Sequence, residues 1–147
     1  MRAALSVALA LVASACSEST GPSADLRVEI SKSAYTLPGV GNPSAEVEFT
    51  VRNTGSAPVA VPLCGLMIGE LQRREGIEWV ALPGGCPAEL PIYAPPLVLA
   101  PGETGYAKAY VEVAGRYRIR VFAAPAVDEK ATEFALSPDF TVRWLED

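Results

Sequence analysis

The stretch EVEFTVRNTGSAPVAVPLC, residues 46–64, decides the fold. Val47, Phe49 and Val51 alternate with charged or polar residues, which is the period-two pattern of a strand with one buried face. A turn-forming cluster at 53–56 follows, and a second apolar run completes the stretch. Because the chain beyond it repeats this alternation of short strand and turn, the sequence predicts an all-β protein.

Composition limits both the size and the chemistry of the protein. The 147 residues, half of them apolar, are enough for one domain with a hydrophobic core. The net charge of -5 comes from interspersed acids and bases, whereas a nucleic-acid partner would normally need a basic stripe. Histidine, the commonest general base and metal ligand, is absent, as are G-x-S-x-G and P-loop signatures. We therefore expect no enzyme, no cofactor, no metal site and no nucleic-acid partner.

The N-terminus has the features of an export signal. Arg2 precedes an apolar run over 3–12 that is too short to span a bilayer as a mature helix but typical of a secretory signal peptide. Ala13 and Ala15 alone satisfy an ordinary signal-peptidase site. With Cys16 behind them, the segment also resembles a bacterial lipoprotein lipobox, although Ala13 stands where Leu is commoner. That resemblance implies that Cys16 becomes the lipidated first residue of the mature protein.

The number of cysteines favours the lipoprotein interpretation. The chain has three, and exported proteins tend to oxidise their thiols in pairs. Lipid on Cys16 leaves Cys64 and Cys86 as a pair, whereas an ordinary signal peptidase would leave an odd thiol at the N-terminus. The wide spacing of Cys64 and Cys86 is unlike that of a redox Cys-x-x-Cys pair, and no histidine is present to complete a zinc site. We predict a structural disulfide between them.

These features divide the chain into three parts. Residues 1–15 are the predicted signal peptide, residues 16–24 the lipidated cysteine with a flexible Ser/Gly/Pro-containing tether, and residues 25–147 a single domain. The predicted location is the cell envelope, where the protein is a membrane-anchored lipoprotein of the outer membrane or cell surface. Its contact with the membrane is then the lipid anchor.

The domain sequence predicts a sandwich of two antiparallel sheets. Besides the opening stretch, strands are expected at 26–31, 35–37, 66–73, 77–82, 106–113, 116–122 and 140–144. The proline-rich passage 83–101 is expected to be loop and edge, because proline cannot donate to a sheet ladder. Residues 128–136 are expected to form one or two helical turns. Seven to nine short strands in one domain are typical of an immunoglobulin-like β-sandwich.

One local motif bears on how the strands are connected. Gly115-x-Tyr117 matches the tyrosine corner at the entry to strand F of immunoglobulin-type domains. A corner places the strands before and after Gly115 in different sheets, whereas a tight hairpin would pair them in one sheet. In the corner interpretation, Ile119 stands where such domains usually have their second cysteine, and Phe49 or Val51 faces it across an apolar core.

Four pieces of the chain together resemble bacterial Ig-like lipoprotein modules of the cell envelope. They are F-T-V-x-N-T-G at 49–55, L-x-R to W-V at 71–80, L-x-P-G-E at 99–103 and G-x-Y-R-I at 115–119. The resemblance implies an Ig-like fold and a non-catalytic binding or structural role, and it carries no catalytic residues. A neighbouring resemblance, to bacterial β-sandwich proteinase inhibitors, implies the alternative of a secreted protease inhibitor that presents the loop from Pro83 to Pro101. A small hydrolase is the third and least favoured reading.

A row of arginines is the main candidate binding surface. Arg116, Arg118 and Arg120 alternate along one expected strand and therefore share a face. Guanidinium groups in a row suit a carboxylate-bearing polysaccharide or a phosphate-rich surface. The favoured alternative is an ordinary solvated sheet face, on which the arginines pair with acids of neighbouring strands. The expected acidic partners are Glu46, Glu48 and Glu112.

Aromatic residues provide a second candidate contact. Tyr93 lies in the proline-rich loop, where it either meets a partner or simply covers a sheet edge. Trp79 and Trp144 are most simply explained by packing in the core or at a sheet edge. The expected partner is an envelope protein or a polysaccharide.

The predicted disulfide can be tested directly. Non-reducing peptide mapping of protein from its native compartment should show one intramolecular link between Cys64 and Cys86. Reduction should lower stability by about 3 kcal/mol, because the bridge restricts the unfolded chain. Hydrogen exchange should stay slow at 47–51 and 117–121, since the burial of these strands does not depend on the bridge. Two free thiols would contradict the pairing.

Overall fold

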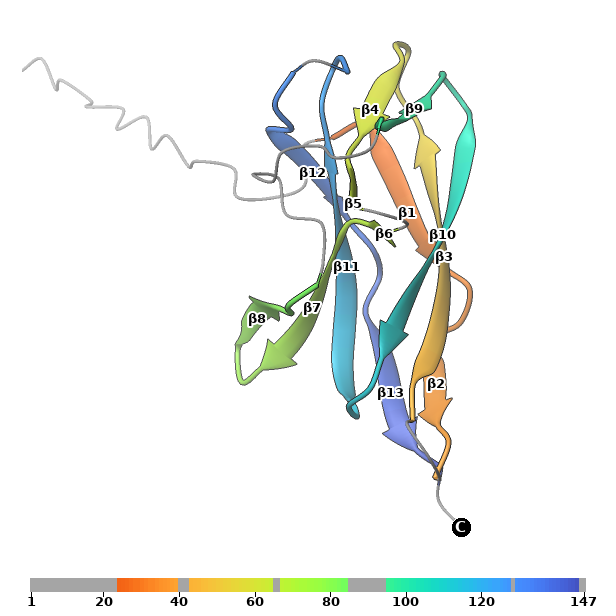
Figure 1. Ribbon diagram of the computed structural model, residues 1–147, viewed down its shortest axis with the longest axis vertical. Helices are drawn as coiled ribbons and strands as arrows, with labels where there is room; N and C mark the ends of the chain where they lie inside the picture. The colour runs from red at the N-terminus through yellow and green to blue at the C-terminus, as the bar shows by residue number, and fades with distance from the viewer. Residues whose placement is uncertain (1–23, 40–42, 65–66, 85–94, 128, 146–147) are drawn as a thin grey trace, which may run out of the picture.

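The computed structural model describes residues 24–39, 43–64, 67–84, 95–127 and 129–145. Within these ranges the chain forms thirteen strands, and Figure 1 shows the two main sheets facing each other along the long axis of the molecule. The described residues contain no helix long and apolar enough to cross a membrane. The all-β sandwich expected from the sequence is confirmed.

The smaller main sheet has three antiparallel strands, with the strand of the opening stretch in its centre. Its order is β1 (Leu26–Ile30), β3 (Ala45–Asn53) and β10 (Thr104–Val111). Along β3, buried and more exposed residues alternate over the whole strand, as the period-two sequence pattern predicts.

The larger main sheet has six strands. Its order is β2 (Ala34–Leu37), β13 (Phe140–Trp144), β11 (Gly115–Ala123), β7 (Glu70–Glu75) and β8 (Glu78–Ala81), and β12 (Glu133–Leu136) also pairs with β11. Two short pairs complete the described structure: β4 (Val59–Val61) with β9 (Leu97–Leu99), and β5 (Leu63–Cys64) with β6 (Met67–Ile68).

The hydrophobic core lies between the two main sheets. Val47 and Val51 of β3 are fully buried in the same cluster as Ile119 and Val121 of β11. Phe140 of β13 stacks on the ring of Tyr117 in this cluster, with ring centroids 5.8 Å apart. The core is therefore apolar at Ile119, as the corner interpretation of the sequence predicts.

A tyrosine corner connects the two sheets. The hydroxyl of the buried Tyr117 donates a hydrogen bond to the carbonyl oxygen of Val113, at 2.6 Å. The strand before the corner, β10, belongs to the three-stranded sheet and the strand after it, β11, to the six-stranded sheet. A Cβ at Gly115 would lie 3.2 Å from the Tyr117 ring, so glycine suits this close approach. The corner is thus confirmed and the hairpin alternative is wrong.

Four local expectations are wrong or incomplete. Residues 133–136 form strand β12 beside β11 instead of helical turns, because the buried Ala135 packs into the core. The strand expected at 66–73 breaks at Gly69, whose φ of 78° interrupts a regular strand. Breaks of this kind, together with β9 inside the proline-rich passage, raise the number of strands above the expected seven to nine. The β2–β13 pair is also parallel, whereas only antiparallel pairs were expected.

Removal of the corner hydroxyl should destabilise the domain. In Tyr117→Phe the ring stays in the core, but the carbonyl of Val113 loses its donor and the free energy of unfolding should fall by about 1–3 kcal/mol. Denaturant unfolding measures this change. The matched control is Tyr106→Phe on the exposed face of β10, which should change stability by under about 0.5 kcal/mol. Equal effects of the two substitutions would contradict this role of the corner.

Candidate functional site

The arginine row lies on the outer face of β11. Arg116, Arg118 and Arg120 alternate with residues whose side chains enter the core, so the three guanidinium groups do share one face. The register of the sheet then decides their neighbours, because β11 pairs with β7 on one side and with β13 on the other.

Each arginine has a side-chain partner in or next to the larger sheet. Arg116 forms an ion pair of 2.6 Å with Asp139, next to the start of β13. The Nε of Arg118 donates to Oε1 of Gln72 at 2.8 Å, and Arg120 forms an ion pair of 2.6 Å with Glu70. Gln72 and Glu70 stand directly opposite Arg118 and Arg120 in the β7–β11 register.

The partners expected from the sequence are wrong. Glu46 and Glu48 lie on β3, in the other sheet, where they face Lys108. Glu112 follows the end of β10, before the chain crosses to the larger sheet. The sequence places the arginines on one face but cannot say which strand lies beside them, and that information decides the pairing.

The arginine partners form a connected polar network. The Nε2 of Gln72 donates to Oε1 of Glu70 at 2.9 Å, and the same oxygen accepts from Arg120. Glu70 is only 5% exposed, although its side chain is on the outer side of the sheet. A carboxylate buried to this degree is tolerated because its charge is paired and hydrogen-bonded.

Trp79 on the edge strand β8 extends this network. Two guanidinium groups lie over its ring, those of Arg118 at 4.4 Å and Arg74 at 5.3 Å from the ring centroid. Burial lowers the pKa of the Arg118 guanidinium below its usual value, while the nearby Asp139 opposes and the charge of Arg120 adds to this effect. The arginine row is therefore engaged in contacts within the protein.

Several other predicted residues lie outside the described part of the chain. These are Cys16, Cys86 and Tyr93. Cys64 lies in β5 and is partly buried, and its pairing with Cys86 stays a prediction. Trp79 packs at a sheet edge as expected, but Trp144 is 51% exposed, so core packing does not explain it.

The opposite side of the molecule has a surface that the sequence analysis did not single out. Tyr106, Lys108 and Tyr110 alternate along β10 on the outer face of the three-stranded sheet. Tyr106 is 82% exposed and Tyr110 57% exposed. In the antiparallel register Tyr106 stands opposite Thr50, which in turn stands opposite Glu29 of β1. We call this surface the β10 face.

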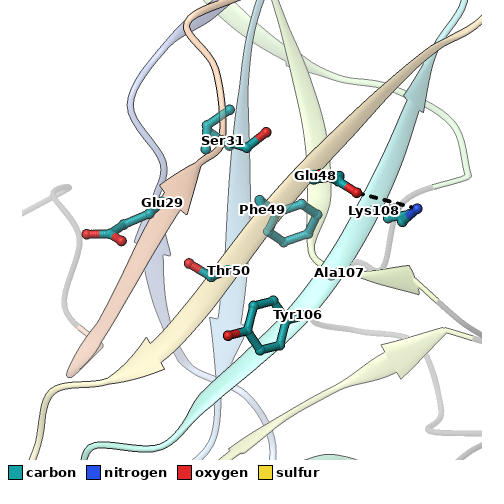
Figure 2. A pocket seen from close by; sticks show the side chains of 9 residues that line it. Glu29, Ser31, Glu48, Phe49, Thr50, Tyr106, Ala107 and Lys108 are labelled. Atoms are coloured by element: carbon teal, nitrogen blue, oxygen red, sulfur yellow. Dashed lines mark ion pairs between the residues drawn. The ribbon is translucent and has the colours of Figure 1, made fainter.

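The β10 face contains a shallow depression of about 420 Å³, which crosses all three strands. Figure 2 shows Tyr106 beside Thr50 in the depression, with Glu48 and Lys108 on its other side. The residues that line it are Glu29, Ile30, Ser31, Glu48, Phe49, Thr50, Tyr106, Ala107 and Lys108. Within the described part of the chain, Tyr106 makes no side-chain hydrogen bond, so its ring and hydroxyl are available to a ligand.

Lys108 organises the charges at one end of the β10 face. Its ammonium group lies 2.6 Å from Glu46 and 3.6 Å from Glu48, and the hydroxyl of Tyr110 donates to Glu46 at 3.2 Å. The hydrogen bond with Glu46 raises the pKa of Lys108 above its usual value. The same bond lowers the pKa of the Glu46 carboxyl, so both groups stay charged at neutral pH.

The sequence pattern of β10 predicts that the two tyrosines share a face, but it does not say where that face lies in the fold. Tyr-x-Lys-x-Tyr at 106–110 has strand periodicity and places two tyrosines on one face. Which face of which sheet they occupy depends on the pairing of β10 with β3, some 60 residues earlier in the chain. No group of three or more potential metal-ligating residues gathers among the described side chains.

Comparisons with known proteins say little about the family or the function of this chain. No protein-family model matches the sequence, and no curated protein matches it either. Among solved structures, the ASH / PapD-like domain of human CEP192 (PapD-like domain 7) is 14% identical, with 99% of each chain covered and a TM-score of 0.45.

Two further structures are similar over parts of larger chains. Pseudomonas fluorescens alkylpurine DNA glycosylase AlkC, bound to DNA containing an abasic site analog, is 12% identical, with a TM-score of 0.38. Listeria innocua β-glucosidase in complex with gluconolactone is 14% identical, with a TM-score of 0.30. The matches cover 82% and 80% of this chain, but only 31% and 16% of those chains. The fold assignment therefore rests on the topology and the corner described above.

The ion pair between Arg120 and the buried Glu70 should contribute more to stability than the exposed pair between Arg116 and Asp139. Arg120→Met leaves the carboxylate of Glu70 without its cation and should lower the free energy of unfolding by about 2 kcal/mol. Arg116→Gln, which breaks the exposed pair with Asp139, should change it by under about 0.5 kcal/mol. Urea unfolding at neutral pH measures both variants. A larger effect at Arg116 would contradict this ranking.

Proposed function

We propose that this protein is a non-catalytic, lipid-anchored cell-envelope protein whose Ig-like domain serves as a binding module. The observation that carries the proposal is the segment Ala13-Ser14-Ala15-Cys16, which follows an apolar run and precedes the folded domain. This order of signal, cysteine, tether and sandwich is what an exported module held at a membrane needs. A single lipid chain anchors a protein only weakly, so more than one chain on Cys16 is expected.

The binding role is supported by the shape and chemistry of the domain. An Ig-like sandwich is a rigid scaffold that presents sheet faces and loops to a partner. The β10 face is polar and aromatic, with Tyr106 exposed beside a depression. The sequence lacks histidine and any catalytic signature, which fits a role in binding.

Mass spectrometry and lipid labelling test the anchor. In a bacterial host, the mature protein should begin at Cys16, carry a lipid mass, incorporate labelled fatty acid and partition into the detergent phase. Cys16→Ser should lose the label and become soluble or stay unprocessed. The double variant Cys64→Ser/Cys86→Ser keeps Cys16 and should keep the label, which serves as the control. An unmodified Cys16 in the intact protein would contradict the proposal.

A further inference from the structure

We propose that the β10 face binds a neutral glycan, a chain of uncharged sugar residues, and that Tyr106 is the platform on which one sugar ring stacks. This inference rests on the proposed binding function and names the ligand class. It moves the candidate site from the arginine row, where the side chains are engaged within the protein, to the opposite side of the sandwich.

The exposed ring of Tyr106 is the first argument. A tyrosine side chain that is 82% exposed on a sheet face, with no side-chain hydrogen bond to any described residue, contributes little to the fold. Tyrosine combines a flat apolar ring with a polar hydroxyl, and it is among the residues that most often dominate binding energies. A sugar ring is complementary to it, because its C–H groups form an apolar face and its hydroxyls point outward.

The polar groups around Tyr106 are the second argument. Thr50 stands directly opposite Tyr106, and Glu29 stands beyond Thr50 in the same row, where it stays exposed despite its ion pair with Arg27. Glu48 lies in the next row and remains exposed despite its ion pair with Lys108. Figure 2 shows these side chains around the depression. They offer one hydroxyl and two carboxylates, which suit sugar hydroxyls because each of those both donates and accepts.

The balance of charge on the β10 face is the third argument. Its three outward carboxylates are matched by three cations, and several of these groups pair with one another. The carboxylates are Glu29, Glu46 and Glu48, and the cations are Arg27, Arg52 and Lys108. A face without net charge attracts neither a polyanion nor a polycation. Electrostatic complementarity therefore favours an uncharged polar ligand.

The dimensions of the face suit a chain of several sugars. The depression of about 420 Å³ falls within the range of small-ligand sites, roughly 300–1,000 Å³. Tyr110 lies four residues further along β10, which is about 13 Å at about 3.3 Å per residue. A ligand that stacks on Tyr106 and continues along the strand therefore also reaches Tyr110.

Affinity electrophoresis and calorimetry test the inference with defined probes. The full-length protein in mild detergent is measured against neutral five-unit oligomers of glucose, mannose and N-acetylglucosamine, and against oligogalacturonate as the anionic comparison. We expect binding to at least one neutral oligomer and none to oligogalacturonate. In NMR spectra, amide shifts on binding should cluster at 46–52 and 104–111. This measurement needs no variant.

Three variants locate the site. Tyr106→Ala should weaken binding at least about tenfold, as truncation of a central aromatic contact usually does, whereas Tyr106→Phe keeps the ring and should stay within about threefold. Trp144→Ala removes another exposed aromatic side chain, on the other sheet, and should leave binding unchanged. Unchanged binding in Tyr106→Ala, a preference for oligogalacturonate, or amide shifts centred on β11 would overturn the inference.

The outcomes of these experiments distinguish failure of the glycan site from failure of the proposed lipid anchor. A lipidated wild-type protein that binds none of the neutral oligomers overturns the glycan site alone. Glycan binding by a protein with unmodified Cys16 overturns the anchor alone. A protein partner captured through Tyr106 and not displaced by neutral oligomers would also overturn the glycan site, since it would assign the β10 face to protein recognition.

Discussion

The hydrogen bond from Tyr117 to the carbonyl of Val113 is the constraint on which the rest of the structure depends. It fixes the point at which the chain leaves the three-stranded sheet and enters the six-stranded one. Because side chains alternate along a strand, the position of this crossing decides which residues of β10 and β11 enter the core. Tyr106 and Arg118 consequently lie on the outer faces of opposite sheets.

The two outer faces differ in how far their polar groups are satisfied. On the larger sheet, Arg118, Arg120, Gln72 and Glu70 form one network, and Glu70 is nearly buried within it. On the smaller sheet the charged side chains pair with one another in exposed positions, while the side chain of Tyr106 makes no hydrogen bond to any described residue. Most polar side-chain groups of this network already have partners, the buried Nε of Arg120 being an exception, so the larger sheet has less to gain from a ligand than the exposed ring and hydroxyl of Tyr106.

Much of the fold could be predicted from local sequence, and the site could not. Alternation at Val47, Phe49 and Val51 fixes β3, and Gly115-x-Tyr117 correctly predicts the corner, because both signals span only a few residues. The partners of Arg118 and Arg120 depend on contacts between β7 and β11, about 50 residues apart. Strand β12 was missed because its pairing with β11, and not its own pattern, makes it a strand.

The start of the domain has a mechanical consequence for a protein held by its N-terminus. The amide of Ala24 donates to the carbonyl of Phe134 in β12, and the carbonyl of Asp25 accepts from Thr54 at the end of β3. Tension arriving through a tether would thus be shared between both sheets from the first residues of the domain. Because β1 is paired with β3 along its length, such a load would pull across several hydrogen bonds together. Under the proposed anchoring, both sheets are hydrogen-bonded to the first residues of the domain, which is where the membrane would exert its load.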